Sequence, residues 1–154
     1  MTGGELQRYL HEHIPLSKAM GAEVVELLPE SVTLSAPLAP NINHRATVFG
    51  GSAAALGMLA AWSLLHARLR TARAASGSAP VRLVVQRSEI HYERPIPGDF
   101  RARARLADPG DWERFLAVLE RRGRARIAVD AVLECNGEAC ALMSGEFVAS
   151  RLDP

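Results

Sequence analysis

The feature that most constrains the fold is a long uncharged stretch in the first half of the chain. From Ala46 to Leu65 no side chain carries a charge. A membrane span needs about 20 apolar residues, so this stretch is long enough for one. Its residues are mostly Ala, Gly and Ser, however, which contribute little to membrane insertion. We therefore expect a helix buried in the protein core and no membrane partner.

Two glycines, Gly50 and Gly51, interrupt the start of this stretch and limit the predicted helix to about Ser52–Arg70. Small side chains in its first turns would let such a helix lie close against a sheet. The segments on both sides are amphipathic strands that must pair in one sheet, which a membrane span between them would prevent. Residues 74–79, rich in Gly, Ser and Ala, predict a mobile connection to the next element.

The other elements are short strands and two surface helices. A capping box at Thr2 and Glu5 begins a helix that ends before Pro15, and a second helix follows Asp108 and ends at Gly123. Hairpin connections dominate the second half. We expect an α+β fold, with a mainly antiparallel sheet of about six strands wrapped around one long central helix. The predicted strands cover residues 22–28, 31–36, 81–92, 100–106, 124–134 and 138–149.

Length and composition fit one domain. The chain has 154 residues, 48% of them hydrophobic, which is enough to bury a core. We assign a single domain to residues 1–154, with an N-terminal helix at 1–15 and the core at 16–150. The formal net charge of +1 gives no overall field that would attract nucleic acid, so no nucleic-acid partner is expected.

The two cysteines and the absence of a secretory signal predict a reducing, cytoplasmic location. If Asn136-Gly137 is a two-residue hairpin turn, Cys135 lies opposite Glu138 and Cys140 lies opposite Leu133. The thiols are then diagonal neighbours, a poor arrangement for a disulfide. One isolated pair of cysteines is also a weak zinc signal, and no metal site is expected.

The loop that leads into the helix, Asn41–Ser52, carries the candidate site. Gly50 and Gly51 leave backbone N–H groups uncovered at a helix N-terminus, where free donors and the helix dipole favour an anion or a developing oxyanion. The alternative interpretation is that the two glycines only permit close packing of the helix on the sheet.

This loop resembles the segment that precedes the central helix in hotdog-fold thioesterases, where an antiparallel sheet wraps one long helix. More narrowly, the run Asn41–Ser52, the segment His91-Tyr92 before Pro95, and the ending 135–149 resemble the YiiD-type putative thioesterase domain. The resemblance covers roughly residues 16–149.

The resemblance implies a hotdog fold and an acyl-thioester ligand carried on coenzyme A or an acyl carrier protein. Coenzyme A or phosphopantetheine would be part of the substrate, with no separate cofactor. The thioester carbonyl would lie over the N–H groups near Gly50 and Gly51, and water would be the nucleophile. Proteins of this class form homodimers through a long strand, here residues 81–92, with a tetramer as an open alternative.

The sequence departs from the family pattern at the general base. Many hotdog thioesterases have Asp or Glu about two turns into the helix, which here falls near Met58, and no carboxylate occurs between Glu30 and Glu89. Histidine titrates near neutral pH, so we take His44 as a catalytic candidate, with Asn43 to orient water or the carbonyl. The substrate-binding candidates are Thr47, Phe49, Gly50, Gly51, Ser52, Glu89 and His91.

Two functions follow from this pattern. The first is an acyl-thioester hydrolase that polarises the carbonyl at the helix N-terminus. The alternative is a non-catalytic acyl-thioester or acyl-carrier binding module, which the missing carboxylate favours. A dehydratase of the same fold usually pairs a histidine with an acid on the helix, so the missing acid counts against that reading too.

Overall fold

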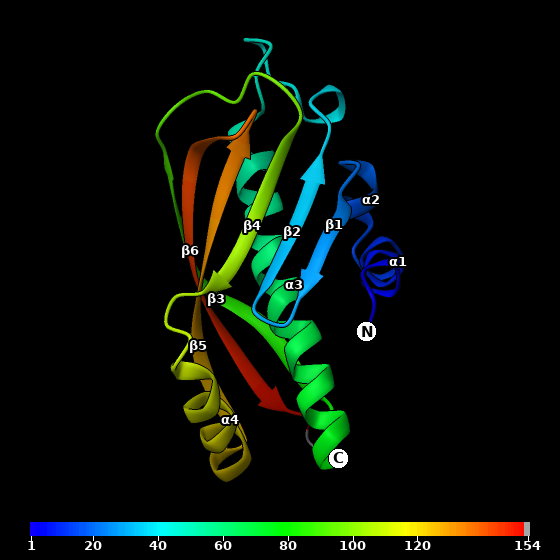
Figure 1. The fold of residues 1–154 in the computed structure, drawn as a ribbon, viewed down its shortest axis with the longest axis vertical. Coiled ribbons are helices and arrows are strands. Elements are labelled where there is room, and N and C mark those ends of the chain that lie inside the picture. The colour runs from blue at the N-terminus through cyan, green and yellow to red at the C-terminus, as the bar shows by residue number, and fades with distance from the viewer. Residues whose placement is uncertain (153–154) are drawn as a thin grey trace.

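A computed structural model of the chain describes residues 1–152 (Figure 1). The expected fold class is confirmed, because a six-stranded antiparallel sheet wraps one long helix. The helices and strands are α1 (Gly3–His13), α2 (Pro15–Ala19), β1 (Glu23–Leu28), β2 (Ser31–Ala36), a 3-10 turn (Ala39–Asn41), α3 (Gly50–Ser76), β3 (Val81–Tyr92), β4 (Phe100–Leu106), α4 (Asp111–Arg122), β5 (Arg124–Cys135) and β6 (Glu138–Arg151).

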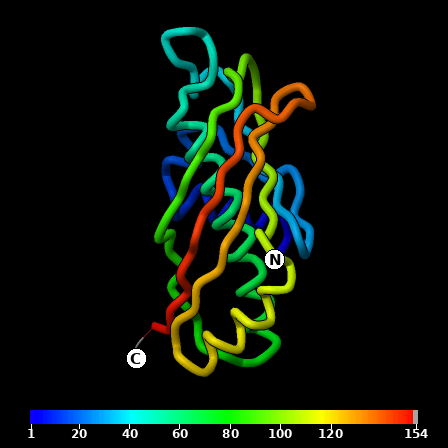
Figure 2. Tube along the Cα trace, turned by 90° about the vertical axis from the view of Figure 1, so that its left-hand side faces the viewer, coloured from blue at the N-terminus to red at the C-terminus, as the bar shows by residue number. Residues whose placement is uncertain are grey.

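The strands follow one another across the sheet in the order β1-β2-β4-β5-β6-β3. Helix α3 packs on one face, and α1 and α2 lie beside the β1 edge (Figures 1 and 2). Strand β3 forms the opposite edge and pairs only with β6 among the strands described. Its outer edge therefore offers unpaired backbone groups, which in other proteins serve for pairing with a further strand.

Helix α3 is longer than the sequence predicts at both ends. Gly50 and Gly51 form its first turn instead of preceding it, and residues 74–76 continue the helix where a connection was predicted. The Ala-rich residues 72–75 have high helix propensity, which explains the extension at the C-terminal end. The helix ends at Gly77, whose φ of 67° is the left-handed conformation typical of a helix end. Just before it, buried Arg73 pairs with Glu120 of α4 at 2.7 Å.

Close contact between α3 and the sheet depends on Gly57. A Cβ atom at this position would lie 3.1 Å from Met143 Sδ and 3.3 Å from Leu133 Cδ2. The apolar side chains around it, such as Leu56 and Leu64, are fully buried. From Gly50 onwards, the uncharged stretch is thus part of a core helix. No helix within residues 1–152 combines the length and the apolar character that a membrane span needs.

The β5–β6 hairpin confirms the predicted turn and corrects one pairing. Asn136 and Gly137 have φ angles of 51° and 79°, as a two-residue turn of this kind requires, and Cys135 lies opposite Glu138. A register shift after Leu133 places that residue opposite Ala141. The predicted Leu133–Cys140 pairing is therefore wrong, because a β-bulge adds one residue to β6.

A stack of four rings joins α1, α3 and β3. Tyr9 of α1 lies between His13 at 4.2 Å and His66 at 4.6 Å, and Trp62 stacks on His66 at 4.5 Å between ring centroids. The Trp62 indole N–H donates to the carbonyl of Leu83 on β3 at 3.1 Å. The N-terminal helix is thereby attached to the central helix and to the edge strand.

The stack should make stability depend on pH. Burial lowers the pKa of His66 from 6.5 to about 4, and the charges of Arg70 and His13 add to this effect. The unfolded chain binds this proton more readily, so the free energy of unfolding should fall as pH drops from 6.5 towards 4. Because the ring is only partly buried, the loss should be about 1–2 kcal/mol. Urea unfolding at pH 7 and pH 4.5 measures it.

The matched control is His66→Phe, which keeps a stacking ring and removes the titrating group. Its unfolding free energy should fall less between the two pH values than that of the wild type. Equal losses in both proteins would show that His66 does not cause the pH dependence.

Candidate functional site

The loop before α3 is held by buried hydrogen bonds. Asn41 is buried, and its Nδ2 donates to the carbonyls of Met20 at 2.9 Å and Pro37 at 2.7 Å. The Asn41 carbonyl in turn accepts from the Phe49 N–H at 2.7 Å. Further along, the Val48 N–H donates to the Ile96 carbonyl at 2.9 Å. These bonds fix the point at which the chain enters the helix.

Asn43 and Thr47 support the loop from within. Asn43 Oδ1 accepts from the N–H groups of Arg45 at 2.8 Å and Thr47 at 3.2 Å, and its Nδ2 donates to Thr47 Oγ1 at 3.0 Å. Both ends of the Asn43 amide are therefore engaged with the loop itself. In the chain as it stands, these two predicted site residues shape the loop and have little capacity left for a ligand.

His44 lies at the tip of this loop. Its side chain is exposed and makes no hydrogen bond with any residue from 1 to 152. The loop projects beyond the body of the molecule at the end where α3 begins (Figure 2). The histidine ring is thus free to contact a ligand, but the structure does not place it against the first turn of α3.

The first turn of α3 has free backbone donors. No side chain caps the helix at Phe49, whose carbonyl accepts from the N–H groups of Ser52 at 2.9 Å and Ala53 at 3.1 Å. The N–H groups of Gly50 and Gly51 have no partner within the described part of the chain. Two adjacent free donors at the positive end of a long helix suit a carbonyl oxygen that gains negative charge.

Two aromatic residues border these donors. The Phe49 ring lies over Gly51, where a Cβ atom would overlap it. From the end of β3, the Tyr92 hydroxyl donates to the Gly50 carbonyl at 2.7 Å. Burial raises the pKa of Tyr92, so its hydroxyl stays protonated as a donor near neutral pH. Tyr92 was not among the predicted site residues, although it lies in the His91-Tyr92 segment that carries the family resemblance.

A hollow of about 290 Å³ opens beside Gly51. Leu16 and Met20 from the α2 region form one wall, and Ser52 and Ala55 of α3 form another. The Ser52 hydroxyl has no hydrogen-bond partner among residues 1–152. The lining contains no acidic or basic side chain, so the hollow suits an alkyl chain better than a charged group. Leu16 and Met20 were not predicted, because their position depends on how α2 packs.

Glu89 and His91 lie away from this hollow. They face each other with 3.0 Å between Glu89 Oε1 and His91 Nε2, and both are exposed. Their neighbour Ile90 packs against the core, so the two side chains point to the outer face of the sheet, opposite α3. Within one chain the structure does not bring these two predicted residues to Gly50.

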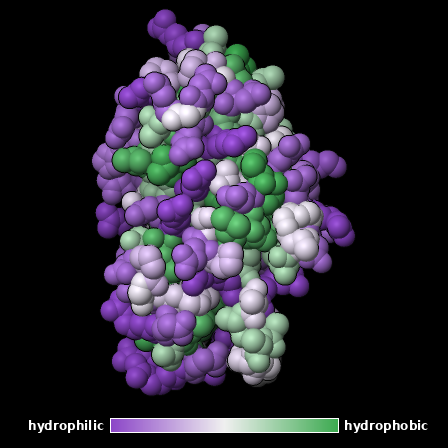
Figure 3. Space-filling view, in the orientation of Figure 1, coloured by the Kyte–Doolittle hydropathy of each residue, from purple (hydrophilic) through white to green (hydrophobic). Residues whose placement is uncertain are grey.

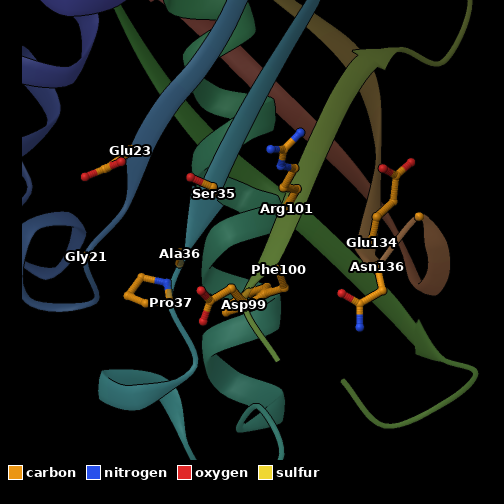
Figure 4. Close-up of a pocket in the computed structure, with 11 residues that line it drawn as sticks. Gly21, Glu23, Ser35, Ala36, Pro37, Asp99, Phe100, Arg101, Glu134 and Asn136 are labelled. Carbon is orange, nitrogen blue, oxygen red and sulfur yellow. The ribbon is translucent and has the colours of Figure 1, made fainter. Parts of the chain in front are cut away.

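A larger hollow of about 710 Å³ lies on that outer face (Figure 4). Glu23, Ser35, Arg101 and Glu134 occupy one row across four strands, in front of α3. This surface is open and polar, with no free helix end. Within residues 1–152, no group of three His, Cys, Asp or Glu side chains is arranged to hold a metal ion. The start of α3 therefore remains the better candidate site.

The six-stranded antiparallel sheet around one long helix is the fold of the hotdog thioesterases. More narrowly, the chain belongs to the family described as "Putative thioesterase (yiiD_Cterm)", whose model matches residues 4–151. The residue pattern identified in the sequence is thus confirmed as that of this family.

Solved structures agree with this assignment. A protein of unknown function from Chlorobaculum tepidum is 25% identical, with a TM-score of 0.87 over 97% of this chain and 94% of that one. A putative thioesterase from Shewanella oneidensis is 26% identical, with a TM-score of 0.83 over 96% of both chains. A thioesterase from Haemophilus influenzae is 13% identical and shares the fold, with a TM-score of 0.77 over 100% of this chain and 94% of that one.

Proposed function

We propose that the protein hydrolyses an acyl thioester carried on coenzyme A or an acyl carrier protein. The observation that carries this proposal is the pair of free N–H groups at Gly50 and Gly51. The thioester oxygen accepts from them, and they stabilise the negative charge that develops as water attacks the carbonyl carbon. The carbon–sulfur bond then breaks, and the thiol and the carboxylic acid leave.

The acyl chain lies in the apolar hollow beside Gly51, between α2 and α3. Ser52 lines the same hollow, and its free hydroxyl is in a position to hold the attacking water or donate to the ligand. His44 accepts the proton of this water, which requires its loop to fold towards the hollow or to reach the site of a second chain. The family's acid on the helix has no counterpart near Met58.

We further infer that two chains pair through β3. This strand is an edge of the sheet, and it exposes the apolar side chains of Val84 and Val85. An exposed edge strand with apolar side chains is prone to pair with another strand. Sedimentation equilibrium should give the mass of a homodimer or of a tetramer built from two such dimers; a monomer at micromolar concentration would contradict this inference.

The hydrolase and its rival are separated by assaying turnover across acyl-CoA chain lengths and acyl-carrier forms. We expect turnover by the wild type and a loss of about a hundredfold in kcat for His44→Ala, the size typical for removing a general base. Arg45→Ala changes the same exposed loop tip without removing a group that titrates near neutrality, and its kcat should stay at the wild-type level. Equal kcat for both variants would exclude His44 as the base.

The alternative function is a binding module for acyl thioesters. It is favoured by the lining of the hollow, which contains no acidic or basic side chain. Tight binding of acyl-CoA with turnover no faster than in buffer, for every substrate and carrier, would support the module and reject the hydrolase.

A further inference from the structure

A second groove lies about 25 Å along α3 from Gly51, at a rise of 1.5 Å per residue. Two hollows of about 540 Å³ and 380 Å³ adjoin there and share Leu28, Pro29 and Arg68. They lie where the β1–β2 turn, the second half of α3 and the start of α4 meet. Volumes of this size are typical of small-molecule sites.

Apolar side chains line one end of the groove. Leu28 is 47% exposed, a large fraction for a leucine. Figure 3 shows apolar side chains gathered near the middle of this face, over the lower ends of β1 and β2. The smaller hollow is lined mainly by apolar side chains, among them Leu27, Ala72 and Trp112. One end of the groove is therefore suited to an alkyl chain.

Arg68 lies between the two hollows. Its guanidinium stacks on the Trp112 ring, with 4.2 Å from Cζ to the ring centroid. It forms no ion pair with any carboxylate of residues 1–152. Burial lowers the pKa of Arg68, while the more distant carboxylates of Glu30 and Glu113 oppose the shift. A partly desolvated guanidinium without a counter-ion is a strong site for a planar anion.

The charges in the larger hollow favour an anion as well. Two arginines, Arg68 and Arg105, line it, whereas the only carboxylate in its lining is that of Glu30. Arg105 is exposed on β4 and forms no ion pair with the other described residues. The groove thus joins a cationic end to an apolar end.

We propose that this groove binds an amphipathic carboxylate of the fatty-acid class. The carboxylate pairs with Arg68 and Arg105, and the alkyl chain lies against Trp112, Leu27 and Ala72. This site is separate from the start of α3 and does not depend on the proposed reaction. If the protein is a thioesterase, its product belongs to the same chemical class as this ligand.

The test is a titration of the nitrogen-15-labelled protein with dodecanoate below its micelle concentration, followed by NMR. The Trp112 indole N–H signal, assigned with Trp112→Phe, and the amides of residues 27–30 should shift with one dissociation constant. Shifts confined to Gly50 and Gly51, or none up to the solubility limit of the probe, would overturn the proposal.

Charge variants test the role of Arg68. Arg68→Gln should weaken dodecanoate binding at this groove by about tenfold or more, the effect expected for losing a charged hydrogen bond. Arg70→Gln makes the same charge change at an exposed position of the same helix and should leave the dissociation constant unchanged. Equal dissociation constants for both variants would overturn the proposal.

Two further measurements separate the contribution of the carboxylate to binding from that of the alkyl chain. Arg105→Gln removes the second cation without touching the Trp112 stack, so it should also weaken binding even if Arg68→Gln perturbs the fold. Dodecanol has the same chain without the charge, and its affinity should be the same for wild type and Arg68→Gln. A tenfold loss of dodecanol affinity in Arg68→Gln would mean that this variant damages the groove. The Arg105→Gln variant then decides. If its dissociation constant for dodecanoate equals that of the wild type, the proposal is overturned.

Discussion

Replacing Gly50 with proline should lower kcat for thioester hydrolysis by about 10²–10³-fold, the usual effect of removing one oxyanion donor. Gly50 is the first helical residue of α3, a position where proline is well tolerated because its N–H has no partner inside the helix. Phe49 already has φ −58° and ψ 131°, a conformation that a residue before proline can adopt. The variant therefore deletes one free donor and leaves the helix intact.

The matched control is Gly50→Ala. Its Cβ would lie 3.3 Å from the Tyr92 hydroxyl oxygen, a tight contact that proline shares. Alanine keeps the N–H, so its kcat should remain close to that of the wild type. Equal losses for the two variants would assign the effect to crowding against Tyr92 and reject the oxyanion role of the Gly50 N–H. Circular dichroism and thermal unfolding check that both variants stay folded.

Replacing Gly57 with leucine should cost about 3 kcal/mol of unfolding free energy, the upper part of the range for overpacked cores. The first carbon of any side chain there already meets Met143 Sδ at 3.1 Å and Leu133 Cδ2 at 3.3 Å. The rest of a leucine side chain has no space unless α3 moves away from the sheet. Urea unfolding monitored by fluorescence gives the change.

Gly57→Ala is the companion variant. Alanine gains about 1 kcal/mol of helix propensity over glycine, which offsets the tight Cβ contact with the flexible Met143 side chain. Its stability should lie near the wild-type value. A leucine variant as stable as the alanine variant would show that α3 does not lie as close to β5 and β6 as the structure has it.

The central helix and the strands were predictable because their signals are local. The uncharged stretch and the alternating strands define their own buried faces, and β3 and β4 have the predicted bounds. The ends of α3 were not predicted, because Gly50 and Gly51 were expected to interrupt a helix and instead begin it. The bulge near Leu133 was not predicted. A two-residue turn determines which residues pair next to it, but an extra residue in one strand shifts all the pairs beyond that point.

The candidate site was predictable in part. Gly50 and Gly51 were found because glycines before a helix leave donors free, and this property belongs to the local sequence. The orientation of Glu89 and His91 depends on which face of β3 meets α3, and alternation alone does not decide this. Leu16 and Met20 enter the hollow through the packing of α2, and Tyr92 reaches Gly50 from a strand end 42 positions away, so no local pattern links them.

The most direct test of the account is a crystal structure of the protein with an acyl-CoA analogue in which a methylene replaces the thioester sulfur. This ketone cannot be hydrolysed, and its oxygen occupies the position of the thioester oxygen. We expect this oxygen to lie about 2.7–3.1 Å from the backbone nitrogens of Gly50 and Gly51, with the alkyl chain in the hollow beside Ala55. A ketone bound elsewhere, with both N–H groups still facing solvent, would contradict it.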